Sequence, residues 1–213
     1  MNIRNFYKKH IGGTALLVGN APNLHETPPA WFDYPSFGMN TIYKYEGWKP
    51  AYYVAVDTRL MNEGGAIIAE RFGDIPKFIP TPNLDAWQGE NFYRFLHRPG
   101  DLYPATSPDS MTVTGISYGN VMHVAMQLAL WMGFTTLLMI GVEHDPQELR
   151  EHFWGIDERM SATPPMKQWL DGYAEIVQHA SQQATILNIS HATHVPAHIL
   201  PRGDWRDWRN DEN

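Results

Sequence analysis

Several short apolar runs in this sequence are followed at once by polar or ionisable side chains that could bind a ligand. In chain order these are Gly19, Asn20, Asn40, Asp57 and Glu143. Asparagine amides both donate and accept hydrogen bonds, whereas carboxylates accept them or hold Mg²⁺. A glycine in a turn also lets the backbone approach a phosphate or ribose closely. Together these residue types favour a site for a nucleotide or another phosphorylated small molecule.

The elements that must position these side chains are indicated by hydrophobic periodicity. Six apolar runs predict buried strands at 15–18, 37–39, 52–56, 77–79, 137–140 and 185–188. Helical spacing predicts helices over 59–72, 117–132 and 166–182, and 81–108 shows no regular pattern. This alternation predicts an α/β fold: a single Rossmann-like domain with a mostly parallel sheet and helices on both faces. In such sheets ligands bind beyond the carboxyl ends of the strands, so we expect the polar residues to gather there.

Composition limits the classes of chemistry. The chain has 213 residues and 43% hydrophobic residues, which is enough for one domain with a sizeable core. It has no Cys, which excludes disulfide scaffolds, thiolate zinc sites, iron–sulfur clusters and a cysteine nucleophile. The formal net charge of -7, without any Lys/Arg run, argues against nucleic-acid partners. We expect a cytoplasmic protein that acts on small molecules.

One stretch, 121–142, has no formally charged residue and is long enough to cross a bilayer. We interpret it as a core helix followed by a core strand, because Gly133 interrupts it and basic flanking anchors are missing. The N-terminus has no apolar region typical of a signal peptide. The sequence therefore predicts no membrane span.

The turn after the first predicted strand, Gly19-Asn20-Ala21-Pro22-Asn23-Leu24, carries a family resemblance. It resembles the G-N-G-P-S-L loop of the bacterial sialyltransferases of glycosyltransferase family 42. It is equally similar to the related DUF115 group, which includes motility-associated glycosyltransferases and archaeal-type hydroxymethyldihydropterin pyrophosphokinases. Further segments resemble family motifs in the same order, at 39–43, 50–57, 114–115, 132–134, 140–143, 152–155 and 186–190. The resemblance spans about residues 14–200 by ordered motifs rather than by one long identity.

This resemblance implies a transferase that moves a sugar from a nucleotide-activated donor, CMP-linked in the sialyltransferases, to an acceptor hydroxyl. It implies no required cofactor and no metal. It assigns donor binding to Gly19, Asn20, Asn40, Asp57, Thr114, Gly115 and Glu143, and the catalytic base to His152. Histidine, with an ordinary pKa of about 6.5, suits the removal of a hydroxyl proton. The Thr114 hydroxyl and the first N–H groups of the following helix could receive the leaving phosphate.

The chain departs from the family pattern at several positions. Ala21 replaces the second loop glycine, Asn23 replaces serine, and Glu143 stands where aspartate is usual. The arginine before the T-S-G turn is missing, and the phosphate-binding tyrosines after G-I-D are not evident, since His144 and Asp145 follow directly. These departures leave open a catalytically degenerate member that binds a ligand without turnover. They also leave open a pyrophosphokinase, in which Asp57, Glu143 and Asp145 would hold Mg²⁺ against ATP.

Two further patterns offer different chemistry. The segment 115–119 matches the G-x-S-x-G nucleophile elbow, with Ser117 as nucleophile and Asp145 following in triad order. His191 or His194 would complete that serine hydrolase, although no buried strand precedes the motif and no oxyanion segment is present. His144, Asp145 and His152 could instead form a metal site, but their spacing matches no standard motif.

Two segments fall outside the regular pattern. The connection 143–165 is long for a strand-to-helix loop, and we expect it to close over the site as a lid. Residues 1–203 form the predicted domain, and 204–213 a tail with a doubled Asp-Trp-Arg. Exposed tryptophans are uncommon without a partner, so this tail should dock on the domain or contact a second subunit in a homo-oligomer.

Overall fold

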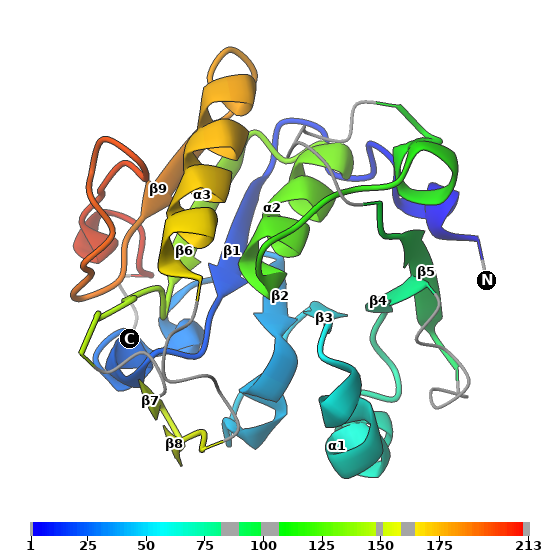
Figure 1. Ribbon diagram of the computed structural model, residues 1–213, viewed down its shortest axis with the longest axis horizontal. Helices are drawn as coiled ribbons and strands as arrows, with labels where there is room; N and C mark the ends of the chain where they lie inside the picture. Colours follow the sequence, from blue (N-terminus) through cyan, green and yellow to red (C-terminus); the bar gives the residue numbers. More distant parts are fainter. Residues whose placement is uncertain (1, 82–89, 99–106, 148–150, 159–164, 211–213) are drawn as a thin grey trace.

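A computed structural model describes residues 2–81, 90–98, 107–147, 151–158 and 165–210 (Figure 1). Seven strands form one sheet in which every neighbouring pair is parallel. Their order across the sheet is β5 (Phe92–Leu96), β4 (Lys77–Thr81), β3 (Tyr52–Val54), β2 (Ser36–Met39), β1 (Thr14–Val18), β6 (Thr136–Ile140) and β9 (Thr185–Asn188). The predicted α/β, Rossmann-like fold is confirmed.

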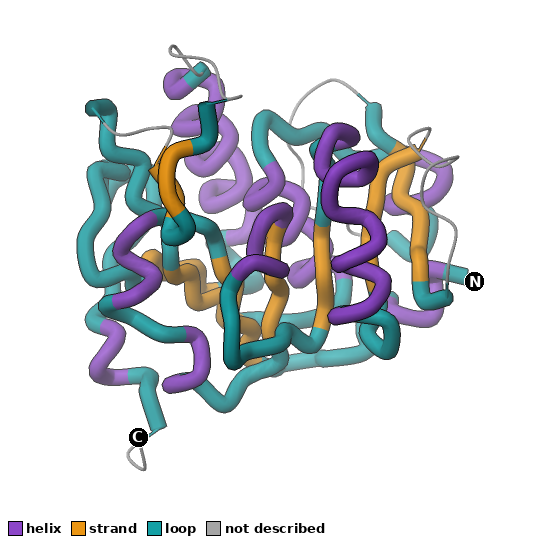
Figure 2. The backbone as a smooth tube through the Cα atoms, turned by 90° about the horizontal axis from the view of Figure 1, so that it is seen from below, coloured by secondary structure: helices purple, strands orange, loops and turns teal. Residues whose placement is uncertain are grey.

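Helices cover both faces of this sheet, as Figure 2 shows from below. Helices α2 (Val121–Trp131) and α3 (Met166–Ala180) lie on one face, and α1 (Thr58–Arg71) lies on the other. Successive side chains of a strand point to opposite faces, and β1 follows that rule. Leu17 packs into the core beneath α2 and α3, whereas Leu16 packs with Ile68 of α1; all three side chains have zero exposure.

Short elements complete the fold. They are 3₁₀ turns at Ile3–Phe6, Pro22–His25, Pro29–Trp31, Asn40–Lys44 and Trp205–Asp207, a π-helix at Ser110–Thr114, and an antiparallel hairpin of β7 (Glu151–His152) and β8 (Gly155–Ile156). Strand β5 lies within 81–108, where the sequence showed no regular pattern. Within that segment, 82–89 and 99–106 lie outside the described residues.

Helix α2 begins later than its hydrophobic spacing predicts. It starts at Val121 because the side chain of Asn120 caps it, its Oδ1 accepting from the His123 N–H at 3.1 Å. The helix ends at Trp131, with Met132 as its C-cap, and the following Gly133 has a left-handed φ of +93°. The cap places Gly119 and Asn120 at the carboxyl edge of the sheet, beside the turn that follows β1.

The switch in strand order lies between β1 and β6, because β2 extends the sheet on one side of β1 and β6 on the other. Here the turns after the two strands touch. Gly19 N–H donates to Ile140 O at 2.9 Å, and Ala21 N–H donates to Gly141 O at 3.1 Å. A Cβ on Gly19 would lie 2.3 Å from the Gly141 carbonyl oxygen. Only glycine allows this approach at position 19.

The structure also places the apolar stretch 121–142 and the residues after 203. In the described part of the chain no helix is long and apolar enough to cross a membrane, and 121–142 consists mainly of α2 and β6. The tail packs on the domain: the Trp205 and Trp31 rings lie 5.1 Å apart, and Asn210 N–H donates to Trp31 O at 2.9 Å.

Candidate functional site

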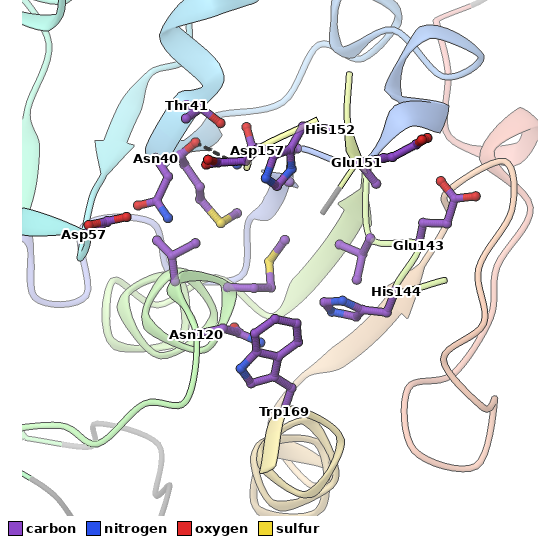
Figure 3. Close-up of a pocket in the computed structure, with 18 of the residues that line it drawn as sticks. Asn40, Thr41, Asp57, Asn120, Glu143, His144, Glu151, His152, Asp157 and Trp169 are labelled. Carbon is purple, nitrogen blue, oxygen red and sulfur yellow. Dashed lines mark hydrogen bonds between the residues drawn. The ribbon is translucent and has the colours of Figure 1, made fainter. Parts of the chain in front are cut away.

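A cavity of about 400 Å³ opens at the carboxyl edge of the sheet, over the switch in strand order (Figure 3). Its walls come from the turns after β1, β2, β3 and β6, the start of α2, one face of α3 and the β7–β8 hairpin. Parallel sheets place ligands at this edge because the turns diverge from the strand ends there. The structure therefore has a cavity at the sheet edge where the sequence predicted a candidate site.

Six of the predicted site residues line this cavity. They are Gly19, Asn20, Asn40, Asp57, Glu143 and His152. Thr114 and Gly115 do not line it. Thr114 ends the π-helix, and a Cβ on Gly115 would face Arg98 and Leu96, on the β5 side of the molecule. The start of α2, with Asn120 and Val121, lies where those two residues were expected.

The two asparagines play different parts. Asn20 Nδ2 donates to Met39 O at 3.1 Å, and this bond ties the β1 turn to the end of β2. Asn20 Oδ1 is buried and has no hydrogen-bond partner among the described residues. Asn40 has a left-handed φ of +43°, and its Oδ1 accepts from Val56 N–H at 3.3 Å. Asn40 thus shapes the turn, whereas Asn20 leaves an acceptor available to a ligand N–H or O–H.

Carboxylates dominate the charge of the lining. Asp57 caps α1 by accepting from Arg59 N–H at 2.9 Å, and it also pairs with the Arg59 guanidinium at 2.8 Å. Arg59 is the only Lys or Arg among the described lining residues. Four more acidic residues line the cavity: Glu143, Asp145, Glu151 and Asp157. An anionic ligand would therefore have to be held by neutral donors rather than by a basic cluster.

Hydrogen bonds of a buried histidine, His123, hold one wall of the cavity in place. His123 Nδ1 accepts from Gly119 N–H, and its Nε2–H donates to Trp169 O, both at 3.1 Å. Trp169 Nε1–H returns a bond to Gly119 O at 3.1 Å. Burial lowers the pKa of His123 to about 3, so the ring is neutral and in one tautomer. These three hydrogen bonds hold Trp169 of α3 against the N-terminus of α2.

A second set of bonds crosses the same wall. Asn120 Nδ2 donates to the Tyr173 hydroxyl at 3.4 Å, and that hydroxyl lies 2.9 Å from His144 Nε2. Burial lowers the pKa of His144 to about 4 and raises the pKa of Tyr173. His144 also has a left-handed φ of +52°, which few non-glycine residues adopt. Such conformations persist where surrounding contacts hold them, often at functional sites.

The described part of the predicted lid includes the β7–β8 hairpin, which carries His152. Phe153 N–H donates to Asn20 O at 3.0 Å, and Trp154 Nε1–H donates to Thr41 Oγ1 at 3.0 Å. The His152 ring stacks on Trp154, with centroids 5.3 Å apart. Figure 3 shows His152 across the cavity from Trp169 and Asn120. Residues 148–150 and 159–164 of the predicted lid lie outside the described residues.

The rival patterns lack a matching arrangement. Ser117 does not line the cavity, although Asp145 does and lies 3.9 Å from His194 Nδ1. The chain from Gly115 to Asn120 precedes α2 instead of turning directly into it, as an elbow would. Across the described ranges, no three His, Cys, Asp or Glu side chains come together as a metal-binding group.

Sequence reasoning missed the contribution of the helices. Asn120, at the start of α2, and Trp169 and Tyr173, in α3, all line the cavity. His144, in the turn after β6, lines it too and was considered only as a metal ligand. The one available signal was Asn120, an N-cap residue directly before an apolar helical run. Trp169 and Tyr173 have the four-residue spacing of one helix face, which fits a buried core as well as a site.

Comparisons with known proteins support the fold. No protein-family model matches the sequence, and a search of curated proteins gives no match. Among solved structures, the MAf glycosyltransferase from Magnetospirillum magneticum AMB-1 is similar, with a TM-score of 0.54 and 14% sequence identity. The match covers 91% of this chain and 36% of that chain, so this protein spans little more than a third of its neighbour's length. At this identity the similarity concerns the fold.

Proposed function

We propose that this protein is a glycosyltransferase-like transferase that takes a sugar from a nucleotide-activated donor bound in the cavity. The observation that carries the proposal is the placement of His152. The hairpin holds this imidazole at the cavity, tied to the Asn20 turn through Phe153 and to Thr41 through Trp154. The glycosyltransferase named above, which shares the fold, supports the same class of reaction.

The lining suits the parts of such a donor. Asn20 Oδ1 offers an acceptor to a base or hydroxyl, and the cavity carboxylates accept from ribose and sugar hydroxyls. The first N–H groups of a helix have no partner within the helix, so Val121 at the start of α2 presents such a group to a phosphate. The proposed reaction needs no resident cofactor, and its donor and acceptor are both small molecules or groups attached to them.

The chemistry assigned to His152 is proton removal. The acceptor hydroxyl oxygen attacks the anomeric carbon of the donor, and the bond from that carbon to the phosphate oxygen breaks. The electron pair of the broken bond stays on the leaving phosphate, and His152 takes the hydroxyl proton. A correctly placed base contributes about 10²–10⁴-fold to such a step.

Ligand-induced stabilisation tests the donor class. Thermal melting should be measured with CMP, UDP-sugars, ATP with and without Mg²⁺, and a pterin, because a ligand of the native state raises the melting temperature. We expect a shift with a nucleotide or nucleotide sugar. A shift with ATP alone that requires Mg²⁺ would replace this proposal with the pyrophosphokinase. A shift without any donor hydrolysis or transfer would favour the binding-only member.

Substitution of His152 tests the base. His152→Phe keeps an aromatic ring to stack on Trp154 but removes the nitrogen that takes the proton. We expect transfer or donor hydrolysis to fall by about 10²-fold or more while the ligand-induced melting shift is kept. His198→Ala, an exposed histidine away from the cavity, is the matched control. Undiminished turnover in His152→Phe would refute the assignment.

A further inference from the structure

The hydrogen-bond partners of Asn120, Tyr173 and His144 determine which atom of each side chain carries a proton. Asn120 Oδ1 accepts from His123 N–H, so the amide nitrogen is the end that faces Tyr173 and donates to its hydroxyl oxygen. Tyr173 has zero exposure, and a buried hydroxyl proton needs an acceptor. Within the described ranges the remaining partner is His144 Nε2, at 2.9 Å. His144 Nε2 therefore accepts, and the neutral ring carries its proton on Nδ1.

The Nδ1–H of His144 is left available to a ligand. His144 lines the cavity beside Trp169 (Figure 3), and its only hydrogen-bond partner among the described residues is Tyr173. Burial keeps the ring uncharged near neutral pH by lowering its pKa. The backbone of His144 has a left-handed φ of +52°. The ring that carries this donor is therefore neutral and lines the cavity.

An anionic oxygen is the group that this donor fits. Sugar and ribose hydroxyls can donate to the carboxylates of the lining, but a phosphate oxygen only accepts and needs N–H or O–H donors. The one described lining Lys or Arg, Arg59, is paired with Asp57. Val121, at the first turn of α2, lines the same cavity. We propose that His144 Nδ1–H donates a hydrogen bond to a phosphate oxygen of the bound ligand, and that Tyr173 and Asn120 fix the tautomer that makes this possible.

This inference rests on the proposed function for the identity of the ligand as a nucleotide, but not for the donor itself. The probes are therefore CMP, UMP and AMP, the matching nucleosides cytidine, uridine and adenosine, and inorganic phosphate. Calorimetric titration of each gives the part of the affinity that comes from the phosphate. His144→Ala removes the donor. His144→Asn keeps an amide N–H near the place of Nδ1 and tolerates a left-handed φ.

For His144→Ala we expect the affinity for the nucleoside monophosphate to fall about tenfold or more, as for a hydrogen bond to a charged group. Affinity for the nucleoside should stay within about twofold, since it lacks the phosphate. His144→Asn should recover most of the loss. Tyr173→Phe, which frees the tautomer but leaves His144 in place, should weaken only the monophosphate. His198→Ala should bind as wild type does, and melting temperatures report whether each variant folds.

The possible outcomes separate the inference about His144 from the proposed function. Equal losses for nucleoside and monophosphate would give His144 a merely structural role and overturn the inference. An unchanged affinity for the monophosphate would overturn it too, with the proposed function intact. Binding of inorganic phosphate that depends on His144, without binding of any nucleotide, would keep the inference and remove the proposed function. A wild-type protein that binds none of these probes would overturn the inference, and the melting shifts with nucleotide sugars would decide the proposed function separately.

Discussion

Substitution of Gly19 tests the close contact on which the whole cavity edge is built. A Cβ at this position would lie 2.3 Å from the carbonyl oxygen of Gly141 and 3.0 Å from its carbonyl carbon. The obstacle is backbone, which cannot swing away as a flexible side chain would. Gly19→Ala must therefore push the turns after β1 and β6 apart where they meet.

The cost can be worked out from the bonds that hold these turns together. Gly19 N–H to Ile140 O and Ala21 N–H to Gly141 O, at 2.9 and 3.1 Å, both lengthen when the turns separate. Each net hydrogen bond contributes about 1 kcal/mol, and overpacking adds about 1–3 kcal/mol. We expect the free energy of unfolding to fall by about 2–4 kcal/mol. For a chain of this size the melting temperature should fall by about 4–16 °C.

The assay is urea unfolding and thermal melting of Gly19→Ala beside Gly65→Ala. Gly65 lies inside α1, and a Cβ there would meet nothing within 4 Å. The same chemical change at Gly65 should therefore stabilise the protein by about 0.4–1 kcal/mol, since alanine favours a helix. Stability of Gly19→Ala within about 0.5 kcal/mol of wild type would refute the contact between the two turns.

Three further predictions test the packing around the site and the tail. Burial lowers the folded pKa of His123 to about 3, against an unfolded value of about 6.5, so its neutral form stabilises the fold fully above pH 6.5. That stability is lost as the pH falls from 6.5 towards 3, by about 2 kcal/mol at pH 5, and urea melts of His123→Gln should lack this component. Trp154→Phe and Thr41→Val each break the hairpin bond of 3.0 Å, so a double-mutant cycle on unfolding should give a coupling of about 1 kcal/mol; additive losses would contradict the bond. Trp205→Ala removes the ring that packs on Trp31, and faster limited proteolysis of the tail than in wild type should follow; an unchanged rate would mean that this contact does not hold the tail.

The sequence predicted most of the sheet because most of its strands are buried on both faces. Such strands are continuous apolar runs, as at Leu137–Ile140, and all six predicted runs became strands. Strand β5 lies at the edge of the sheet, and its residues are mainly half-buried or exposed. Its Arg94 is exposed, so no apolar run marked the strand.

The site was predictable where it depends on strand ends and not where it depends on helices. Alternating strands and helices predict a parallel sheet whose carboxyl ends share one edge, and Asn20, Asn40 and Asp57 line one cavity there. Where α2 begins was decided by a single side chain, Asn120, against an apolar periodicity that extends further towards the N-terminus. Thr114 was expected at the cavity because Thr114-Gly115 resembles the T-S-G turn of the family, and the helix after it was expected to begin four residues earlier than it does.

The excess of acidic over basic residues in the whole chain is also present in the lining of this cavity. A formal net charge of -7 allows basic clusters anywhere on the surface, but the described lining holds five carboxylates and the single guanidinium of Arg59. Two histidines that could add positive charge, His123 in the wall and His144 in the lining, are kept neutral by burial, which lowers the pKa of each. Burying a cation without a partner is costly, whereas a neutral imidazole with fixed hydrogen bonds is not. The hydrogen bonds that these buried rings make then fix which nitrogen carries the proton. Recognition of a phosphate here would depend on the direction of N–H groups rather than on attraction between opposite charges, and such recognition requires the rigidity that the Gly119–His123–Trp169 and Asn120–Tyr173–His144 bonds supply.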